Sequence, residues 1–205
     1  MRTAAALALW VSLTSCGLGS PIAATTPVAG TTTTPDQAAS APRITPPAVT
    51  PPTPPGTTLP AFKCADVSGG AAGSANVTAV RMSELAGYDR FVIQFDAKVP
   101  TYTVKRQVKR QAKPSFKSGG SGQSITLSGA AGALVQVHSA TGAGSYTGST
   151  DMSHGEFLVL NEARLVEDFE GYLGWGLGLS KPACLRAFTL AGPPRLVVDF
   201  STASR

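Results

Sequence analysis

The sequence of 205 residues is poor in the residue types that most often build catalytic and metal sites. It contains two histidines and three cysteines, and only 14% of its residues are charged. It has no G-x-S-x-G, H-E-x-x-H, P-loop or C-x-x-C motif. Two histidines and two cysteines that lie far apart supply too few ligands for a zinc site. We therefore expect no catalytic residues, no metal and no cofactor.

Two short segments contain side chains of the types that catalytic sites use, but their arrangement in the sequence does not suit a catalytic site. Ser153 and His154 follow Asp151, but neighbours on a strand point to opposite faces, so they do not form a triad. The other segment is acidic, and we interpret it as the solvated face of a loop: Glu167, Asp168 and Glu170. A hydrolase is therefore not the favoured function.

The apolar run at the start of the chain is too short to span a bilayer, which takes about 20 residues, and is typical of a signal peptide. It ends at Leu13-Thr14-Ser15-Cys16, which resembles the bacterial lipobox. We expect removal of a signal peptide over residues 1–15 and diacylation of Cys16, which would anchor the protein durably in a membrane. The alternative is an ordinary secretory signal with a chance cysteine; both alternatives export the chain.

Once Cys16 is assigned to lipid, Cys64 and Cys184 remain as a pair in a compartment that permits disulfides. A bridge between them would close a loop on the order of 120 residues, which the chain-entropy model values at about 4–5 kcal/mol. The alternative is two separate buried thiols. We expect the disulfide.

Composition divides the exported chain into a tether and a domain. Residues 17–60 hold 11 of the 16 prolines and 11 threonines, with no aromatic residue. Such a segment buries too little apolar surface to offset its ordering entropy, so we expect a disordered Pro/Thr-rich tether over residues 16–60. Residues 61–205 are numerous enough for one domain with its own core.

The domain sequence is strand-like. Residues 91–95 are β-branched and aromatic, and apolar residues alternate with polar ones in several later runs. Short strands separated by Gly/Ser-rich turns predict an all-β fold, an antiparallel sandwich or barrel. Residues 157–169 fit a helix or a strand, and we expect strand through part of them. Residues 174–178 predict a glycine-flanked strand that backbone or ligand approaches closely.

The densest charge of the chain lies between residues 105 and 113. The net charge of +5 is modest, but it points toward anionic surfaces and, in an exported protein, not toward nucleic acid. One interpretation is a patch that grips an anionic envelope polymer; the alternative is a solvated edge strand, on which lysines block unwanted pairing. The residues of the candidate patch are Lys105, Arg106, Lys109, Arg110 and Lys113.

The domain sequence holds an ordered set of motifs: residues 87–96, 99–104, 169–171, 175–179, 188–190 and 192–200. Together they resemble the AMIN-like domain of bacterial lipoproteins, and the resemblance covers roughly residues 76–201. It implies an antiparallel β-sandwich in the cell envelope. The related AMIN domains bind peptidoglycan or localise envelope machinery.

Within these motifs we select four candidate ligand-binding residues: Tyr88, Arg90, Trp175 and Arg195. Arginine makes bidentate contacts with carboxylates such as those of peptidoglycan stem peptides. Trp175 could stack on a sugar. The alternative for both arginines is a structural ion pair with Asp96 or Asp199.

The favoured function is a non-catalytic lipoprotein, anchored to a membrane through Cys16, that binds the cell wall or localises envelope machinery. The membrane would be the outer face of the plasma membrane, or the periplasmic side of an outer membrane. The alternatives are a lipoprotein that docks another envelope protein and a carrier with a cavity inside the sandwich.

Overall fold

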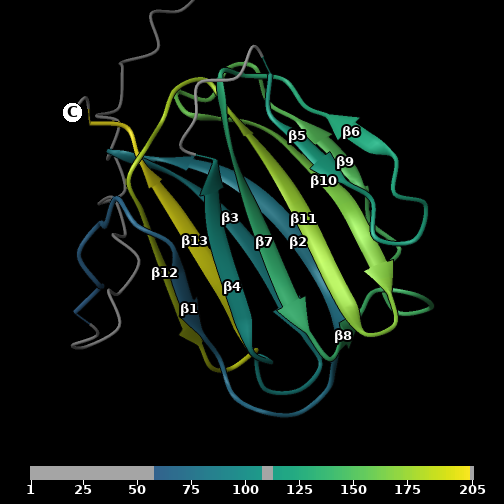
Figure 1. Cartoon of the computed structure of the whole chain (residues 1–205). Coiled ribbons are helices and arrows are strands. Elements are labelled where there is room, and N and C mark those ends of the chain that lie inside the picture. The colour runs from purple at the N-terminus through teal and green to yellow at the C-terminus, as the bar shows by residue number, and fades with distance from the viewer. Residues whose placement is uncertain (1–57, 108–112, 204–205) are drawn as a thin grey trace, which may run out of the picture. The chain divides into compact units, whose positions relative to one another are not determined.

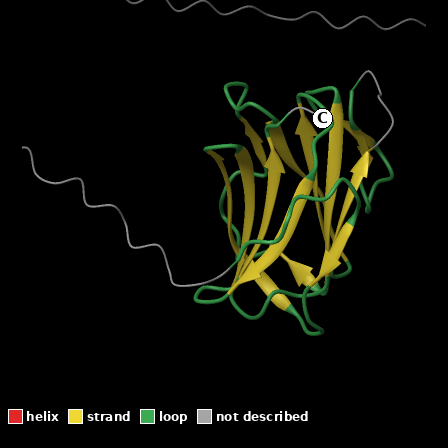
Figure 2. Cartoon of the chain, turned by 90° about the vertical axis from the view of Figure 1, so that its left-hand side faces the viewer, coloured by secondary structure: helices red, strands yellow, loops and turns green. Residues whose placement is uncertain are grey.

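Two β-sheets packed face to face form the fold (Figure 1). The computed structural model describes residues 58–107 and 113–203. The predicted signal peptide, Cys16, nearly all of the tether, and two members of the basic patch, Lys109 and Arg110, lie outside the described residues. In the part that is described, no helix has the length and apolar character needed to cross a membrane. The expected all-β sandwich is confirmed, and Figure 2 shows its layers of strands from the side.

One sheet has five strands. In spatial order they are β12 (Leu185–Leu190), β13 (Arg195–Ser201), β3 (Tyr88–Phe95), β2 (Ala75–Leu85) and β8 (Ala140–Thr141). All neighbours in this sheet are antiparallel except β2 and β8, which form a short parallel pair. Three of the motifs that resemble the AMIN-like domain, residues 87–96, 188–190 and 192–200, fall in this sheet.

The second sheet has six strands. In spatial order they are β1 (Val67–Gly69), β4 (Tyr102–Gln107), β7 (Ala131–His138), β11 (Tyr172–Leu179), β10 (Leu160–Phe169) and β9 (Asp151–Ser153). All of its pairs are antiparallel. A separate hairpin, β5 (Ser115–Lys117) with β6 (Ser124–Thr126), packs on the outer face of this sheet.

The core lies between the sheets, and β3 shows how the sequence builds it. Buried and half-buried residues alternate strictly along this strand, so Phe91 and Ile93 point inward while Arg90 and Val92 point outward. The buried Asp89 is the polar exception on the inner face. Its Oδ2 accepts the backbone N–H groups of Val159 and Leu160, at 2.6 and 2.9 Å, and so ties the five-stranded sheet to the start of β10.

The glycines of β11 explain where the hairpin sits. Gly174, Gly176 and Gly178 lie on the outer face, between inward residues such as Trp175. A Cβ at Gly176 would lie 2.7 Å from Cδ2 of Phe116, and one at Gly178 would collide with the backbone carbonyl of Ser128. The predicted close approach is confirmed, and what approaches is the chain itself.

The strand predictions were most accurate where buried and exposed residues alternate regularly. Residues 160–169 form β10, so the helical alternative for that segment is excluded. β2 was not predicted from the sequence, although it has 11 residues. A β-bulge between Val77 and Ala79 shifts its register against β3, and a one-residue shift exchanges the buried and exposed faces.

Candidate functional site

The four candidate ligand-binding residues do not form one site. Tyr88 and Arg90 lie together on the outer face of the five-stranded sheet, because both are outward positions of β3. Arg195 is opposite Gln94 at the far end of the same face, four residues along β13 from the partner of Arg90. At about 3.4 Å per residue, that separation is roughly 14 Å.

Trp175 lies inside the core. Its side chain is only 1% exposed, and its ring packs against Phe91 and Tyr146, with centroids 5.8 and 6.2 Å away. The expectation that Trp175 stacks on a sugar at the surface is therefore wrong. On an inward strand position, burial of the large indole ring is favourable because it removes a large apolar area from water.

Tyr88 and Arg90 belong to a larger group, which we call the arginine–aromatic cluster: Phe62, Tyr88, Arg90, Arg186, Phe188 and Asp199. Arginine and aromatic side chains alternate in it. The guanidinium of Arg186 lies 4.4 Å from the ring centroid of Phe62 and 4.8 Å from that of Tyr88. The guanidinium of Arg90 lies 5.2 Å from Tyr88 and 5.7 Å from Phe188. These are cation–π distances.

One carboxylate holds both arginines. Asp199 is fully buried; its Oδ1 accepts from Arg90 Nε at 2.7 Å, and its Oδ2 accepts from Arg90 Nη2 at 3.0 Å and from Arg186 Nε at 2.8 Å. The register explains this geometry, since these residues are directly opposite one another on β12, β13 and β3. The hydrogen bonds to Asp199 raise the pKa of Arg90. The structural ion pair considered for Arg90 is thus present.

The cluster keeps an excess positive charge. Two guanidinium groups share one carboxylate, so one positive charge is not balanced within the cluster. Among the hydrogen bonds of the described residues, none uses Nη1 of Arg90, or Nη1 or Nη2 of Arg186. The side chains are partly exposed, 22% for Arg90 and 11% for Arg186. The cluster can therefore still donate to an anion.

Asp96 and Arg195 take no part in such a pair. Asp96 accepts from the backbone N–H and the side-chain amide of Asn76, both at 2.8 Å, and these bonds lower the pKa of Asp96. Arg195 donates through Nε to the carbonyl of Pro193, and it has no ion pair within the described residues. The ion-pair alternative for Arg195 is therefore wrong.

Three members of the cluster, Phe62, Arg186 and Phe188, were not predicted from the sequence. Arg186 and Phe188 are two residues apart on β12, which places both on the outer face. The same spacing in Tyr88 and Arg90 was a usable signal. Phe62 gave none, because its place depends on a contact between distant parts of the chain.

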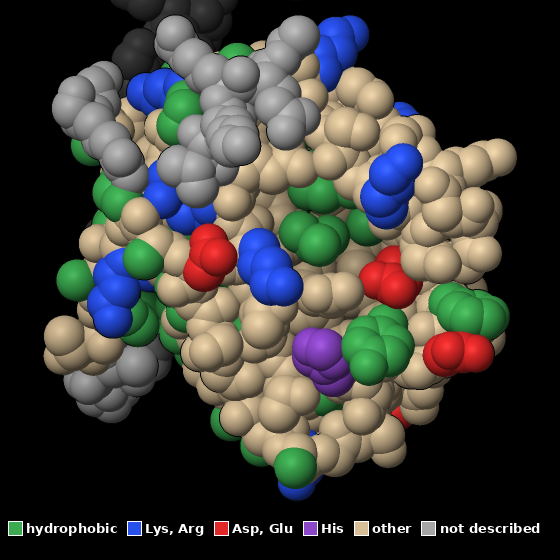
Figure 3. Space-filling model, viewed as in Figure 1, with side chains coloured by type: hydrophobic (Ala, Val, Ile, Leu, Met, Phe, Trp, Pro, Cys, Tyr) green, Lys and Arg blue, Asp and Glu red, His purple; other side chains and the backbone are tan. Residues whose placement is uncertain are grey.

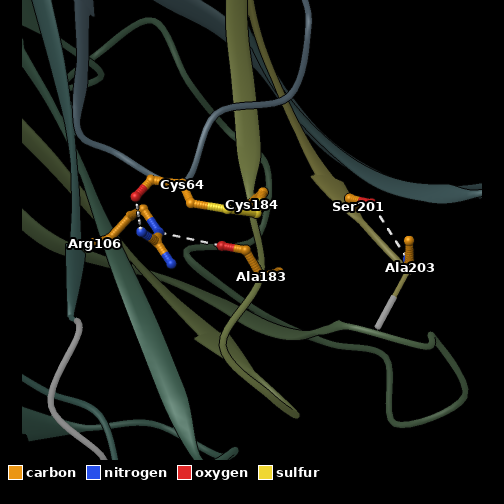
Figure 4. The surroundings of a disulfide bond; sticks show 6 residues. All are labelled: Cys64, Arg106, Ala183, Cys184, Ser201 and Ala203. Carbon is orange, nitrogen blue, oxygen red and sulfur yellow. Dashed lines mark hydrogen bonds between the residues drawn. A yellow bond between two sulfur atoms is a disulfide. The ribbon is translucent and has the colours of Figure 1, made fainter. Parts of the chain in front are cut away.

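The predicted disulfide between Cys64 and Cys184 is present, and it joins the segment before β1 to the start of β12 (Figure 4). Arg106 lies beside it and donates from Nη1 to the carbonyl of Cys64 and from Nε to that of Ala183. A backbone pair between Lys63 and Leu185 continues the connection. The segment that carries Phe62 is thereby fixed to the five-stranded sheet.

These contacts change the interpretation of the basic patch. Arg106 points toward the disulfide, whereas its neighbour Lys105 is exposed on the opposite face of β4, so the two do not share a surface. Lys113 is also exposed. On the visible face of Figure 3, lysine and arginine side chains are scattered, with acidic side chains between them.

The side chains that suggested a triad have other partners. Asp151 pairs with Arg164, and Nδ1 of His154 lies 2.8 Å from a carboxylate oxygen of Glu156. Ser153 ends β9 and is exposed. Among residues 58–107 and 113–203, no group of three or more His, Cys, Asp or Glu side chains could hold a metal ion.

The acidic segment was expected to be a solvated loop, and this expectation is wrong for two of its members. Glu167 and Asp168 lie on β10, where neighbouring side chains diverge. Glu167 accepts from the amide of Gln136, and Asp168 accepts from Thr141 Oγ1 and the N–H of Gly142. Glu170 occupies the turn, with φ of 50°.

Comparison with known proteins agrees with the fold and the motifs. A search of curated proteins gives no match. The family model of the AMIN-like domain matches residues 75–202, which is more than half of the chain and spans β2 to the end of β13. The chain therefore belongs to the AMIN-like domain family, and its function is associated with the cell envelope.

Proposed function

We propose that this protein is a non-catalytic envelope lipoprotein whose AMIN-like domain binds peptidoglycan through the arginine–aromatic cluster. Lipid on Cys16 anchors it to the membrane, and the Pro/Thr-rich tether carries the domain to the cell wall. Arg195 lies on the same face and adds a second cation to the binding surface, whereas Trp175 takes no part in it.

The unbalanced positive charge of the cluster is the observation that carries this proposal. Three guanidinium nitrogens of Arg90 and Arg186 make no hydrogen bond to the described residues, and the adjacent rings hold both groups in place. A preorganised guanidinium loses little side-chain entropy on binding and can take a carboxylate through two hydrogen bonds. Peptidoglycan stem peptides present such carboxylates beside sugar rings.

A sedimentation assay with purified sacculi tests the proposal. The full chain should co-sediment with untreated sacculi, and chemical amidation of their carboxyl groups should abolish most of the binding. Arg186→Lys keeps the charge and loses the planar fork, so we expect about tenfold weaker binding, the value of one charge-assisted hydrogen bond. Arg81→Lys is the matched control, because Arg81 is exposed on the same sheet face.

Two results would contradict this function. Equal binding to amidated and untreated sacculi would remove the carboxylate as the ligand. Absence of binding to untreated sacculi would instead favour the alternative, in which the same exposed face docks another envelope protein.

The anchor has a test of its own. Cys16→Ser should move the protein from the membrane fraction to the soluble fraction of cells, because two acyl chains supply durable anchoring that the rest of the chain is not expected to provide. Retention of the variant in membranes would contradict lipidation at Cys16 without affecting the peptidoglycan proposal.

A further inference from the structure

The outer face of the five-stranded sheet carries two arginines besides those of the cluster. Arg81 is opposite Val92 and Arg195 is opposite Gln94, so the pairing of β2, β3 and β13 places both on the face of Arg90. Neither has an ion pair within the described residues. Among the residues that share this face on β2, β3, β12 and β13, the buried Asp199 is the only acid. The face therefore has a clear excess of positive charge.

Two exposed leucines lie beside the cluster. Leu85 is directly opposite Tyr88 on the same face and is 37% exposed. Leu59 is 38% exposed and precedes Phe62, whose ring packs on Arg186 and Tyr88. A soluble anionic polymer would bind the arginines and leave the leucines in water. The interface of an anionic bilayer takes up both kinds of side chain.

The tether joins the domain at this face. Pro60 and Ala61 line a small hollow together with Arg186 and Ala187 of β12. The disulfide that follows holds this segment beside the strand (Figure 4). From residue 16 to residue 58, at about 3.5 Å per residue, the chain can reach no further than about 150 Å. A lipid on Cys16 would therefore keep the face at a high effective concentration of the headgroups of that membrane.

We propose that this face docks on the anionic phospholipid headgroups of the membrane to which the protein is anchored. The guanidinium groups bind lipid phosphates through paired donors, and Leu59, Leu85 and the rings of the cluster enter the interfacial region. The inference rests on the proposed lipid anchor and adds a regulation to the proposed function. Because Arg90 and Arg186 serve both ligands, the domain binds either the membrane or peptidoglycan.

Vesicle flotation tests the docking without the anchor. The mature chain, residues 16–205 with Cys16→Ser, carries neither signal peptide nor lipid. It should float with vesicles of phosphatidylcholine that contain one third phosphatidylglycerol, and not with phosphatidylcholine alone. Raising the salt from about 0.1 M to about 1 M shortens the Debye length from about 10 Å to about 3 Å and should release the chain. Without the tether, binding should need a high lipid concentration, so the variant still leaves the membranes during cell fractionation.

Two variants separate this surface from the peptidoglycan site. Arg81→Gln removes one cation near the headgroups and should weaken vesicle binding about fivefold. Leu85→Gln removes an exposed apolar side chain and should weaken it at least about threefold. Neither residue belongs to the peptidoglycan site, so both variants should sediment with sacculi like the parent.

Matched controls change the same kinds of side chain on the other sheet. Lys105 and Phe169 are both exposed there, so Lys105→Gln and Phe169→Gln should bind the mixed vesicles like the parent. Urea midpoints near that of the parent should show that all four variants fold. An excess of mixed vesicles should displace the parent from sacculi, and phosphatidylcholine vesicles should not.

The two proposals fail in different ways. Equal binding to the two kinds of vesicle, or full vesicle binding by both Arg81→Gln and Leu85→Gln, overturns membrane docking and leaves sacculus binding untouched. A loss in Arg81→Gln without one in Leu85→Gln overturns the bilayer as the partner and favours a soluble anionic polymer. Sacculus binding that mixed vesicles do not reduce overturns the shared use of the cluster. Vesicle binding without sacculus binding supports docking and contradicts the peptidoglycan proposal.

Discussion

The outer faces of the two sheets are covered in opposite ways. The five-stranded sheet covers itself with long side chains, because the rings and guanidinium groups of the arginine–aromatic cluster pack against one another over β12, β13 and β3. The six-stranded sheet has almost no side chain on the outer face of β11 to do this. Phe116 of the β5–β6 hairpin covers Gly176 instead, and Leu127 and Ser128, which follow β6, cover Gly178. Phe116, Leu127 and Val166 form a second small core under that hairpin.

The two coverings have different consequences for function. Under the hairpin, apolar side chains of the hairpin pack on apolar side chains of the sheet, and this contact leaves no unbalanced charge for a ligand. The cluster closes its face with charge and leaves one cation unbalanced, which an external anion can satisfy. A binding surface on this protein is therefore expected on the five-stranded side, and its cost is a dependence on one buried carboxylate.

Of the variants that test this difference between the two outer faces, Asp199→Asn is expected to lower the free energy of unfolding most. It leaves two adjacent guanidinium groups without their shared carboxylate, and breaking a buried ion pair costs about 3–5 kcal/mol. Urea denaturation should show this loss in the free energy of unfolding. Asp151→Asn is the control, because Asp151 pairs with Arg164 at the surface, where the expected loss is below about 1 kcal/mol. Equal losses in the two variants would mean that the buried carboxylate of the cluster stabilises the fold no more than a surface ion pair does.

Removal of the disulfide should come next. The double variant Cys64→Ser, Cys184→Ser opens a loop with a sequence separation of 120 residues, and loss of such a native bridge costs about 2–5 kcal/mol. Phe62, two residues from Cys64, should then lose protection. Hydrogen exchange should rise at residues 61–67 and stay low in the β5–β6 hairpin. Uniform loosening of both regions would contradict a local role of the disulfide, at the edge where the segment before β1 meets β12.

Much of the fold could be predicted from local patterns. The β-branched and aromatic run of residues 91–95 and the alternation of Val135 and Val137 with polar neighbours were enough to place those strands. Glycine at every second position of residues 174–178 predicted a close approach. The bulge in β2 could not be predicted, because an extra residue reverses the alternation on which the prediction depends. The two-residue strand β8 exists only through its pairing with β2 and has no pattern of its own.

The candidate site could be predicted only in part. Tyr88 and Arg90 were found, since arginine beside an aromatic residue in a strand is visible in sequence. Trp175 was misplaced, because the sequence alone did not say which face of β11 turns inward. The convergence of Arg186 on Asp199 depends on the register of β12 against β13, which links residues by tertiary pairing rather than by spacing.

Gly176→Ala tests the covering of the other sheet. Its Cβ would lie 2.7 Å from a ring carbon of Phe116 and 3.1 Å from Val166, so the hairpin must shift, at an expected cost of about 1–3 kcal/mol. Gly155→Ala is the control, because a Cβ at Gly155 meets nothing within 4 Å. Denaturation should separate the two variants, and sacculus binding should be the same in both. Weaker binding by Gly176→Ala would place the binding surface on the hairpin side.

Phe62→Leu should have the smallest effect and is the sharpest test of the cluster. Leucine keeps much of the apolar volume and removes the ring that lies 4.4 Å from the guanidinium of Arg186. A cation–π contact at a partly exposed site contributes about 0.5–1 kcal/mol, so the free energy of unfolding should fall by about that amount. Phe169→Leu is the control, because Phe169 is 52% exposed and its replacement should change little. The ring of Phe62 packs on one face of the Arg186 guanidinium, so removal of this ring should also weaken sacculus binding. The loss in binding free energy should exceed the loss in the free energy of unfolding. If sacculus binding is unchanged while the free energy of unfolding falls, the rings only cover the sheet. The aromatic side chains of the five-stranded sheet would then have the same structural role as the hairpin on the six-stranded sheet.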